Sequence, residues 1–404
     1  MTILDTFTTR DGAIEIGGLP LSRLAERAGR TPFFAYDRSK LAERVALLRR
    51  WLAPDIRIHY SIKANPMPAL VHCMAGLVDG FDVASAGELR VALDTGMAAE
   101  HIALAGPGKT ELDVRSTVGA GATLTLESVH QLDAAARAGQ ALGVRPRVAL
   151  RINPDFQPKT SGMRMGGGPR QFGIDAEQAP GVLAAIAQRD LDFRGFHVFW
   201  GSQCLDADTV ISAQRHVAEL VVRLADQAKA PVAFVNMGGG FGIPYFENER
   251  ALDLEPIGAA MRQWLVPLRQ RLPEARLAME FGRYLVGEAG IYVCRILDKK
   301  VSRGETFLVT DGGLHHQLAA SGNFGQVLRR NYPVAIGNKS GLPATETCHI
   351  VGCLCTPLDR IADRVALASP DIGDFVVVAQ SGAYGRSASP AAFLSHPEPA
   401  EILV

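Results

Sequence analysis

Residues 57–66 read RIHYSIKANP, and the lysine near the end of this stretch is in an unusual place. Apolar side chains alternate along the run as they do in a half-buried strand, and an Asn-Pro pair ends it directly after Lys63 and Ala64. Lysine normally favours a solvated helix face. Lys63 either extends its ammonium group from the rim of a sheet or lies in a partly desolvated pocket, where a lysine can form a Schiff base with a carbonyl.

Seven more short apolar runs follow, and longer segments with helical spacing separate them. The candidate strands are 57–63, 78–83, 101–106, 122–127, 146–152, 193–199, 232–238 and 277–281. Such alternation favours an α/β fold of the (β/α)8 TIM-barrel type, in which helices connect parallel strands. A doubly wound sheet is the alternative, because alternation alone does not show that the sheet closes.

The pattern changes after residue 284, where strand-like runs are joined by turn residues without long helical segments. The stretch GAIEIGG near the N-terminus is also strand-like and could pair with this region. We therefore expect a barrel at 32–280, and a mostly β domain formed by 1–31 and 281–404.

Composition excludes several classes of protein. The 404 residues contain 42 Lys+Arg and 42 Asp+Glu, and nucleic-acid binding normally needs a basic excess. No run of about 18 apolar residues indicates a membrane span, and the N-terminus does not resemble a signal peptide. The six cysteines form no disulfide framework, and the single residue between Cys353 and Cys355 is poor spacing for zinc. We expect a cytoplasmic protein without a metal.

Three motifs at strand ends carry groups with possible chemistry. The loop NMGGGFG at 236–242 includes Gly239 and Gly240, whose backbone N–H groups could approach a phosphate or simply form a tight turn. MEFGRYL at 279–285 contains Glu280 and Arg283, which could be a rim ion pair or ligands of a heterocycle and its phosphate. HVFWGSQ at 197–203 places His197 and Phe199 on one strand face, as core residues or as part of a site.

The β domain adds VGCLCTPLDRI at 351–361 and QSGAYGRSASP at 380–390. Taken singly, Cys355 is more often an inert thiol and Tyr384 a packing residue. The order of all these motifs along the chain resembles the fold-type III pyridoxal-phosphate (PLP) decarboxylases, which include ornithine, arginine and diaminopimelate decarboxylases. The resemblance extends from TPFFAYD to SGAYG.

The resemblance implies a role for each motif. Lys63 would carry PLP through a Schiff base, Glu280 would keep the pyridine nitrogen protonated, and Cys355 would reach the partner's active site across a homodimer interface. The carbanion left by the departing CO2 would then be protonated, with Cys355 as the acid. The remaining expected cofactor contacts are Asp82, Ser202, Gly239, Gly240, Arg283 and Tyr384.

Four departures from the family pattern concern the substrate, the cofactor face and the dimer. Enzymes acting on diamino substrates have an acid where Thr356 stands, and the distal-ammonium acid of ornithine decarboxylases falls near Asn323. Arg329 and Arg330 lie nearby. The histidine that stacks on the cofactor in the family aligns with Phe199, and His197 lies two residues earlier on the same strand face. Gln171 replaces a lysine that pairs with the aspartate matching Asp359, and Arg170 is the possible substitute.

Stretches such as MRMGGGPRQFGID and HHQLAASGNFGQVLRRN resemble the exosortase-associated PLP decarboxylases and the carrier-protein-linked glutamate decarboxylase of butirosin biosynthesis. This resemblance implies an amino-acid substrate or an acyl-carrier-linked aminoacyl group, bound through Thr356, Asn323, Arg329 and Cys355. A conventional diaminopimelate or ornithine/lysine decarboxylase is the alternative. A racemase and a non-catalytic PLP-binding protein fit the motifs less well.

Overall fold

The structure is a computed structural model that describes residues 6–157, 163–326 and 328–404. It divides into two compact units. The described residues up to Glu43 form the first unit with Pro244–Arg250 and Leu285–Val404, and the second unit comprises Arg44–Ile243 and Ala251–Tyr284. We call them the β unit and the barrel unit. The boundaries given above, 32–280 and 1–31 with 281–404, stay a prediction.

Eight parallel strands close into a barrel in the second unit, which confirms the predicted TIM-type fold. They are β5 (Ile56–Ser61), β6 (Gly80–Val83), β7 (Ile102–Leu104), β8 (Thr123–Leu126), β9 (Arg147–Asn153), β12 (Asp192–Val198), β14 (Phe234–Asn236) and β15 (Arg276–Phe281). The pairings β8–β9 and β15–β5 complete the ring, so the doubly wound alternative is wrong. Short β11 (Ile174–Asp175) adds to β9, and β10 (Met163–Arg164) pairs with β13 (Gly201–Ser202).

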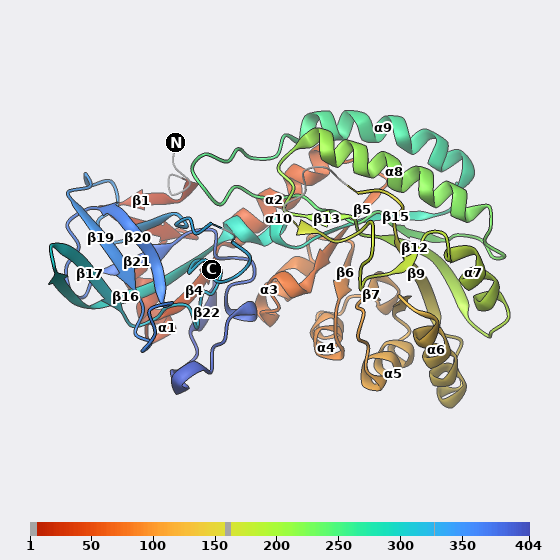
Figure 1. Cartoon of the computed structure of the whole chain (residues 1–404), viewed down its shortest axis with the longest axis horizontal. Helices are drawn as coiled ribbons and strands as arrows, with labels where there is room; N and C mark the ends of the chain where they lie inside the picture. The colour runs from red at the N-terminus through yellow and green to blue at the C-terminus, as the bar shows by residue number, and fades with distance from the viewer. Residues whose placement is uncertain (1–5, 158–162, 327) are drawn as a thin grey trace. The chain divides into compact units, whose positions relative to one another are not determined.

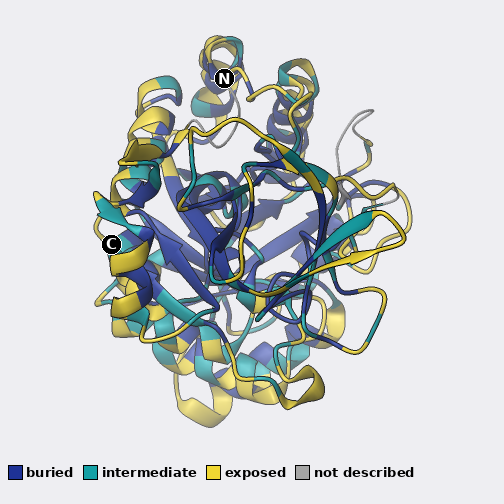
Figure 2. Ribbon diagram, turned by 90° about the vertical axis from the view of Figure 1, so that its left-hand side faces the viewer, coloured by how far each residue is buried: buried dark blue, intermediate teal, exposed yellow. Residues whose placement is uncertain are grey.

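Helices surround these strands (Figure 1). They are α3 (Pro68–Ala75), α4 (Ala86–Asp94), α5 (Glu111–Ala120), α6 (Val129–Leu142), α7 (Ala179–Ala187), α8 (Ala207–Ala225) and α9 (Leu254–Arg271). In α8, the sequence determines both where the helix begins and which face is buried. The Asp206 carboxylate caps its first turn by accepting from Thr209 N at 3.0 Å, and Val210, Val217 and Leu224 bury one face. α8 packs against α9, and the strands inside are buried (Figure 2).

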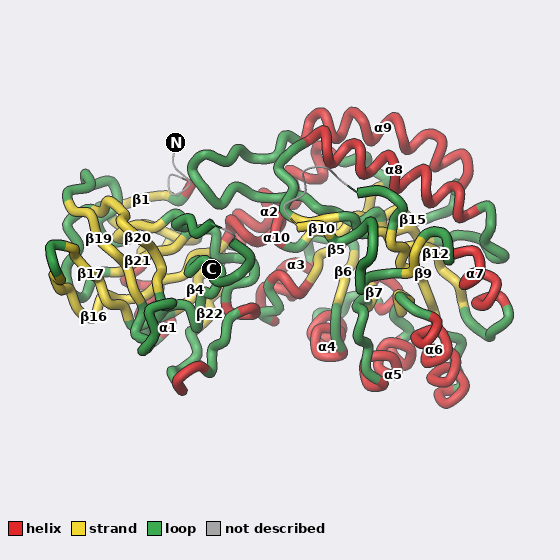
Figure 3. Tube along the Cα trace, viewed as in Figure 1, coloured by secondary structure: helices red, strands yellow, loops and turns green. Residues whose placement is uncertain are grey.

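The first unit is mostly β, as predicted (Figure 3). Its main sheet runs β18 (Val334–Ile336), β21 (Phe375–Val378), β16 (Gly290–Ser302), β17 (Glu305–Thr310), β19 (Glu346–Val351) and β20 (Arg360–Leu367). β4 (Phe33–Tyr36) joins β16, and β22 (Ala400–Leu403) joins β4. The β unit also contains helix α1 (Leu21–Ala28). Helices α2 (Arg38–Trp51) and α10 (Arg283–Val286) each cross a boundary between the units, so only part of each belongs to the β unit.

The N-terminal stretch GAIEIGG forms a strand of its own small sheet. β1 (Thr8–Arg10), β2 (Ala13–Ile16) and β3 (Leu19–Pro20) make an antiparallel meander. Ile14 N donates to Gly337 O at 2.8 Å, and Ile14 and Ile16 join the hydrophobic core of the β unit. Among residues 6–157, 163–326 and 328–404, no helix is long and apolar enough to cross a membrane.

Candidate active site

Lys63 lies just beyond the carboxyl end of β5, at the rim of the barrel. The strand ends at Ser61, and Lys63 stands in a single 3-10 turn, Ile62–Ala64. Asn65 closes this turn: its carbonyl accepts from Tyr60 Oη at 2.8 Å, and its side chain accepts from Met67 N at 3.1 Å. Lys63 is exposed, because it stands past the strand end, so the partly desolvated setting considered above is wrong for this structure. Its ammonium nitrogen faces the Phe199 ring, 5.6 Å from the centroid.

Glu280 is a buried carboxylate inside the barrel, near the end of β15. His197 Nε2 on β12 lies 3.1 Å from its Oε2, and Asn236 Nδ2 donates to the same oxygen at 2.9 Å. Burial alone would raise the pKa of Glu280, but the charges of His197, Lys63 and Arg151 outweigh it and lower that pKa to about 2. Glu280 is therefore an anion inside the barrel at neutral pH.

Asp82 on β6 is the second buried carboxylate of this region. Asn236 Nδ2 also donates to its Oδ1 at 3.3 Å, and His59 Nδ1 lies 3.5 Å from its Oδ2. Burial raises the pKa of Asp82, and the neighbouring Glu280 raises it further. Two carboxylates with opposite pKa shifts therefore share one amide, and Glu280 carries the more firmly held negative charge.

His197 on β12 and Phe199 just after it, the two candidates for the cofactor face, have different surroundings. His197 is buried and commits a ring nitrogen to Glu280, whereas Phe199 is half-buried and faces Lys63. The two side chains thus contact different members of the Lys63–Glu280 pair.

The glycine loop after β14 packs against its neighbours without room for side chains. A Cβ on Gly239 would lie 1.8 Å from the carbonyl oxygen of Glu280, and one on Gly240 would meet the Trp200 ring at 2.6 Å. Gly240 also has a φ of +85°, which L side chains rarely adopt. Ser202 on β13 and Arg283 at the start of α10 are both half-buried. The loop thus holds strand ends tightly together.

Arg151 is a site residue that sequence reasoning missed. It projects from β9, and its Nη1 lies 3.2 Å from both oxygens of Glu127. Lys109 Nζ is 3.6 Å from the same carboxylate, and the Arg151 guanidinium lies over the Phe172 ring at 4.9 Å. The sequence could have signalled Arg151, because a parallel barrel strand is covered on both faces and an arginine within the run RVALRIN must then be buried.

These groups line one cavity of about 130 Å³ at the carboxyl ends of the strands. Its charged and aromatic lining consists of Lys63, Asp82, Arg151, Phe172, His197 and Glu280. A larger hollow of about 260 Å³, lined by Arg57, His101 and Arg276 among others, lies at the strands' amino ends. Barrel enzymes carry their reactive groups at the carboxyl ends, so the smaller cavity is the candidate active site.

The other predicted site residues belong to the β unit. Cys355 is exposed in the loop after β19, and Thr356 is half-buried beside it. Asp359 is buried: its carboxylate accepts from Leu314 N at 2.6 Å and from Leu354 N at 2.9 Å. Asp359 therefore holds two loops of its own chain, while Gln171 and Arg170, in the barrel unit, are exposed.

Asn323 and Arg329, expected near the distal end of the substrate, are held by groups of their own unit. Asn323 Nδ2 donates to Ser321 Oγ at 2.8 Å and to Leu358 O at 3.3 Å. Arg329 Nε donates to Ser321 O at 3.1 Å, which fixes the guanidinium against its own loop.

Arg330 and Tyr384 complete the β-unit candidates. Arg330 Nη2 pairs with Glu249 Oε1 at 3.2 Å and lies over the Phe246 ring, so its charge is balanced within the chain. Tyr384 is half-buried with a φ of +53°. Non-glycine residues held in the left-handed region cluster at functional sites, so this backbone conformation is consistent with a functional role for Tyr384.

The chain belongs to the pyridoxal-dependent decarboxylases. The family model described as "Pyridoxal-dependent decarboxylase, pyridoxal binding domain" matches residues 38–287, more than half of the chain. The protein is therefore a PLP-dependent amino-acid decarboxylase, as the resemblance implied.

Two curated relatives and one solved structure illustrate the likeness. The L-glutamyl-[BtrI acyl-carrier protein] decarboxylase of Niallia circulans is 38% identical over 381 residues, 92% of this chain and 88% of that protein. The diaminopimelate decarboxylase of Aquifex aeolicus is 31% identical over 405 residues, 98% of this chain and 91% of that protein. The Helicobacter pylori diaminopimelate decarboxylase crystallised with L-lysine matches with a TM-score of 0.82 at 25% identity, covering 95% of this chain and 94% of that one.

Proposed function

We propose that the cavity at the carboxyl ends of the barrel strands holds PLP, with Lys63 as its attachment point and Glu280 facing its pyridine nitrogen. Two features of this chain fit the cofactor. The Lys63 amine lines the same cavity as a buried carboxylate that stays ionised, and a carboxylate of this kind stabilises a protonated heterocycle. When bound, PLP supplies an electron sink for the pair of electrons left by the departing CO2.

The residues around Glu280 keep it in place for this role. His197 and Asn236 both contact its Oε2, so the carboxylate is held from two sides and keeps its negative charge. Phe199, beside the Lys63 ammonium, is the better of the two aromatic candidates for the cofactor face, because His197 already serves Glu280. The expected phosphate contacts are Ser202, Gly239, Gly240, Arg283 and Tyr384, and Asp82 completes the set of cofactor-binding residues.

Cys355 is proposed as the acid that delivers a proton to the substrate α-carbon. Its exposure in the β unit suits a side chain that acts on the partner's active site in a homodimer. All six cysteines are free, which suits a reducing compartment such as the cytoplasm. We expect the enzyme to act there as a homodimer in amino-acid metabolism.

The substrate we favour is a carrier-protein-linked glutamyl thioester. The single observation that carries this choice is the 38% identity, over 92% of the chain, to a decarboxylase named for such a substrate. Thr356 supports it, because a hydroxyl there offers no charge to a distal ammonium group. Asn323 and Arg329 lie on a loop that would meet the distal part of the substrate. A free diamino acid is the competing substrate, suggested by the diaminopimelate decarboxylase relatives.

Substrate assignment is tested by CO2 release from the PLP-loaded enzyme. The panel consists of a carrier-linked glutamyl thioester, free glutamate, free lysine, ornithine and meso-diaminopimelate. We expect kcat/KM for the thioester to exceed that for every free amino acid by at least about 10²-fold, which corresponds to roughly 3 kcal/mol of discrimination. Faster turnover of a free diamino acid would overturn the carrier-linked assignment while leaving PLP-dependent decarboxylation intact.

A further inference from the structure

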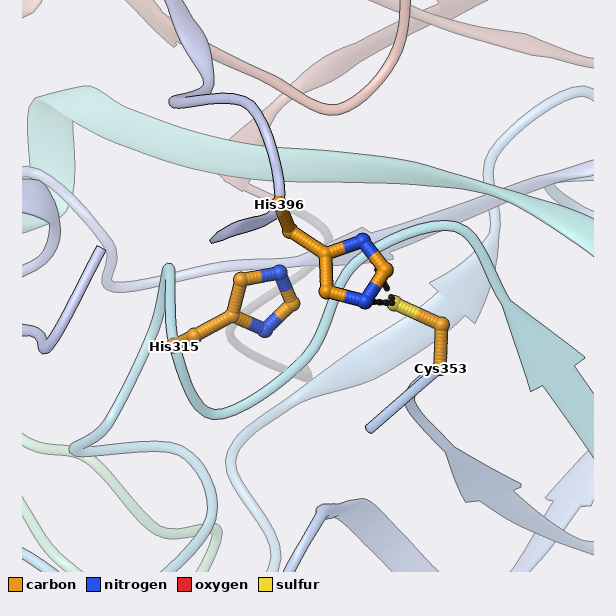
Figure 4. A group of neighbouring side chains, drawn as sticks. All are labelled: His315, Cys353 and His396. Carbon is orange, nitrogen blue, oxygen red and sulfur yellow. Dashed lines mark hydrogen bonds between the residues drawn. The ribbon is translucent and has the colours of Figure 1, made fainter. Parts of the chain in front are cut away.

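Three side chains of the β unit meet in a cluster that decarboxylation does not use. They are His315, Cys353 and His396 (Figure 4). One ring nitrogen of each histidine and the cysteine sulfur all lie within 4.8 Å of one another. His315 comes from the loop after β17, Cys353 from the loop after β19, and His396 from the segment before β22. Three segments distant in sequence thus contribute one nitrogen or sulfur donor each.

His315 is the buried member, and its ring is unsatisfied. Its exposed fraction is 0%, and neither ring nitrogen has a hydrogen-bond partner among the residues that the structure describes. Leaving buried polar nitrogens without partners costs free energy, so such a ring requires an explanation. The neighbouring rings of His315 and His396 lie 5.2 Å apart by centroid.

Neighbouring residues position the cluster. His316 is fully occupied: its Nδ1 lies 3.2 Å from Tyr292 Oη and its Nε2 lies 3.0 Å from Pro397 O. It therefore fixes the backbone next to both His315 and His396 without being available as a ligand. Support of this kind around the ligands is typical of metal sites.

The position of the sulfur argues against a thiol–imidazole pair built for nucleophilic attack. Cys353 Sγ lies 3.9 Å from His396 Nδ1 and 3.8 Å from Nε2, so neither nitrogen is aimed at it more closely than the other. A base that activates a thiol approaches through one nitrogen at hydrogen-bond distance. The sulfur also lies 3.7 Å from Asp311 O, an ordinary contact for a protonated thiol.

We propose that His315, Cys353 and His396 bind one thiophilic divalent cation of the zinc class. Two imidazole nitrogens and a thiolate are ligands that Zn²⁺ prefers, and bonds of about 2.0–2.3 Å in a tetrahedron separate the ligand atoms by roughly 3.5 Å. Cys353 and His396 are half-buried, so small rotations of these two side chains bring their donors to that spacing. Three protein ligands leave the fourth position for a water molecule.

Binding is a ligand exchange without oxidation or reduction. The Cys353 S–H bond breaks as the metal–sulfur bond forms, and the released proton goes to solvent. The metal would join the loop that carries Cys355, two residues after Cys353, to the C-terminal segment before β22. The spacing of Cys353 and Cys355 gave no sign of this site, because the other ligands come from distant parts of the sequence.

Metal binding by the purified, chelator-treated holoenzyme tests the proposal, with Co²⁺ as a spectroscopic probe and Zn²⁺ as a competitor. We expect one Co²⁺ per chain, visible bands of tetrahedral cobalt beyond the absorption of PLP, a thiolate-to-cobalt charge-transfer band, and one proton released per Zn²⁺ bound. Cys353→Ser and His396→Ala change half-buried positions and should each weaken binding at least about tenfold to a hundredfold. His315→Ala should do the same wherever the variant folds.

Matched controls are Cys73→Ser in α3 and His130→Ala on the exposed part of α6, neither of which should alter binding. Unchanged cobalt spectra in Cys353→Ser, or equal losses in the controls, would overturn the assignment, as would the absence of stoichiometric binding by the unaltered protein. The readout is metal binding, so it is independent of the substrate proposed above.

Discussion

At the scale of single residues, the protein keeps a buried carboxylate charged inside the barrel. Glu280 is buried, yet the nearby His197, Lys63 and Arg151 lower its pKa to about 2 against the opposing effect of burial. Glu280 therefore lies buried among partners from other strands and not at the exposed rim of the barrel. The charge of the Glu280 carboxylate should therefore matter to catalysis.

Glu280→Gln keeps the size of the side chain and removes its charge. We expect kcat to fall roughly a hundredfold or more, the loss typical when a fixed electrostatic partner of the developing charge is removed. Steady-state CO2 release with saturating PLP measures this change. Glu274→Gln, on an exposed loop residue, is the matched control and should behave as the unaltered enzyme. Equal turnover in the two variants would remove Glu280 from the mechanism.

The sequence singles out Lys63, Glu280 and Cys355 as candidates because each lies in a recognisable motif. It does not single out Arg151 and Asn236, whose roles depend on partners from other strands. A single arginine inside an apolar run carries no local sign that Glu127 lies 3.2 Å away. The sequence offered an exposed rim lysine as one of two interpretations of Lys63, and the structure selects it, since the strand ends two residues earlier than the alternation suggested.

At the scale of elements, the eight strands were found from periodicity, but closure of the sheet was not, because pairing between β8 and β9 leaves no trace in local spacing. For the glycine loop too, local sequence did not reveal the contacts with other elements. Its glycines suggested anion binding, whereas the structure shows that they are also needed for strand ends to approach one another.

Gly239→Ala and Gly181→Ala form an informative pair. A Cβ on Gly239 would overlap the Glu280 carbonyl at 1.8 Å, so we expect a loss of about 1–3 kcal/mol or more in stability. A Cβ on Gly181 in α7 meets nothing within 4 Å, so alanine should stabilise that helix by roughly 0.5–1 kcal/mol. Chemical denaturation of each variant and of the unaltered protein measures whether the free energy of unfolding falls in Gly239→Ala and rises in Gly181→Ala. A tolerated Gly239→Ala would contradict the packing described for this loop.

The loop after β7 holds a lysine whose proton makes stability depend on pH. Burial lowers the pKa of Lys109 to about 8, with its Glu127 partner opposing the shift. The unfolded chain keeps this proton up to the ordinary value of 10.5, whereas the folded chain releases it near 8. Unfolded chains therefore bind more protons in this window, and this group makes the free energy of unfolding rise as pH increases from about 8 to 10.5.

Lys109→Met should remove that contribution. The measurement is urea denaturation of both proteins at a series of pH values across the window. The difference in unfolding free energy between the unaltered protein and the variant should grow with pH. A difference that stays constant would show that Lys109 does not titrate as described.

At the scale of the whole molecule, the proposed site depends on two chains, because Cys355 is expected to act on its partner. Lys63→Ala and Cys355→Ser should each be inactive as homodimers. Mixed dimers contain one intact site, so random reassociation of equal amounts should restore roughly a quarter of the original activity. Activity recovered after mixing and reassociation measures this directly, and no recovery despite mixed-dimer formation would place Cys355 within its own chain's site.

The assignment of Lys63 is tested most directly by reducing the PLP-loaded protein with borohydride and mapping the modified peptide by mass spectrometry. We predict a pyridoxyl group on Lys63, lost in Lys63→Ala and kept in the exposed-lysine control Lys229→Ala. A reduced cofactor found on another lysine, or a reducible absorbance band that persists in Lys63→Ala, would contradict it.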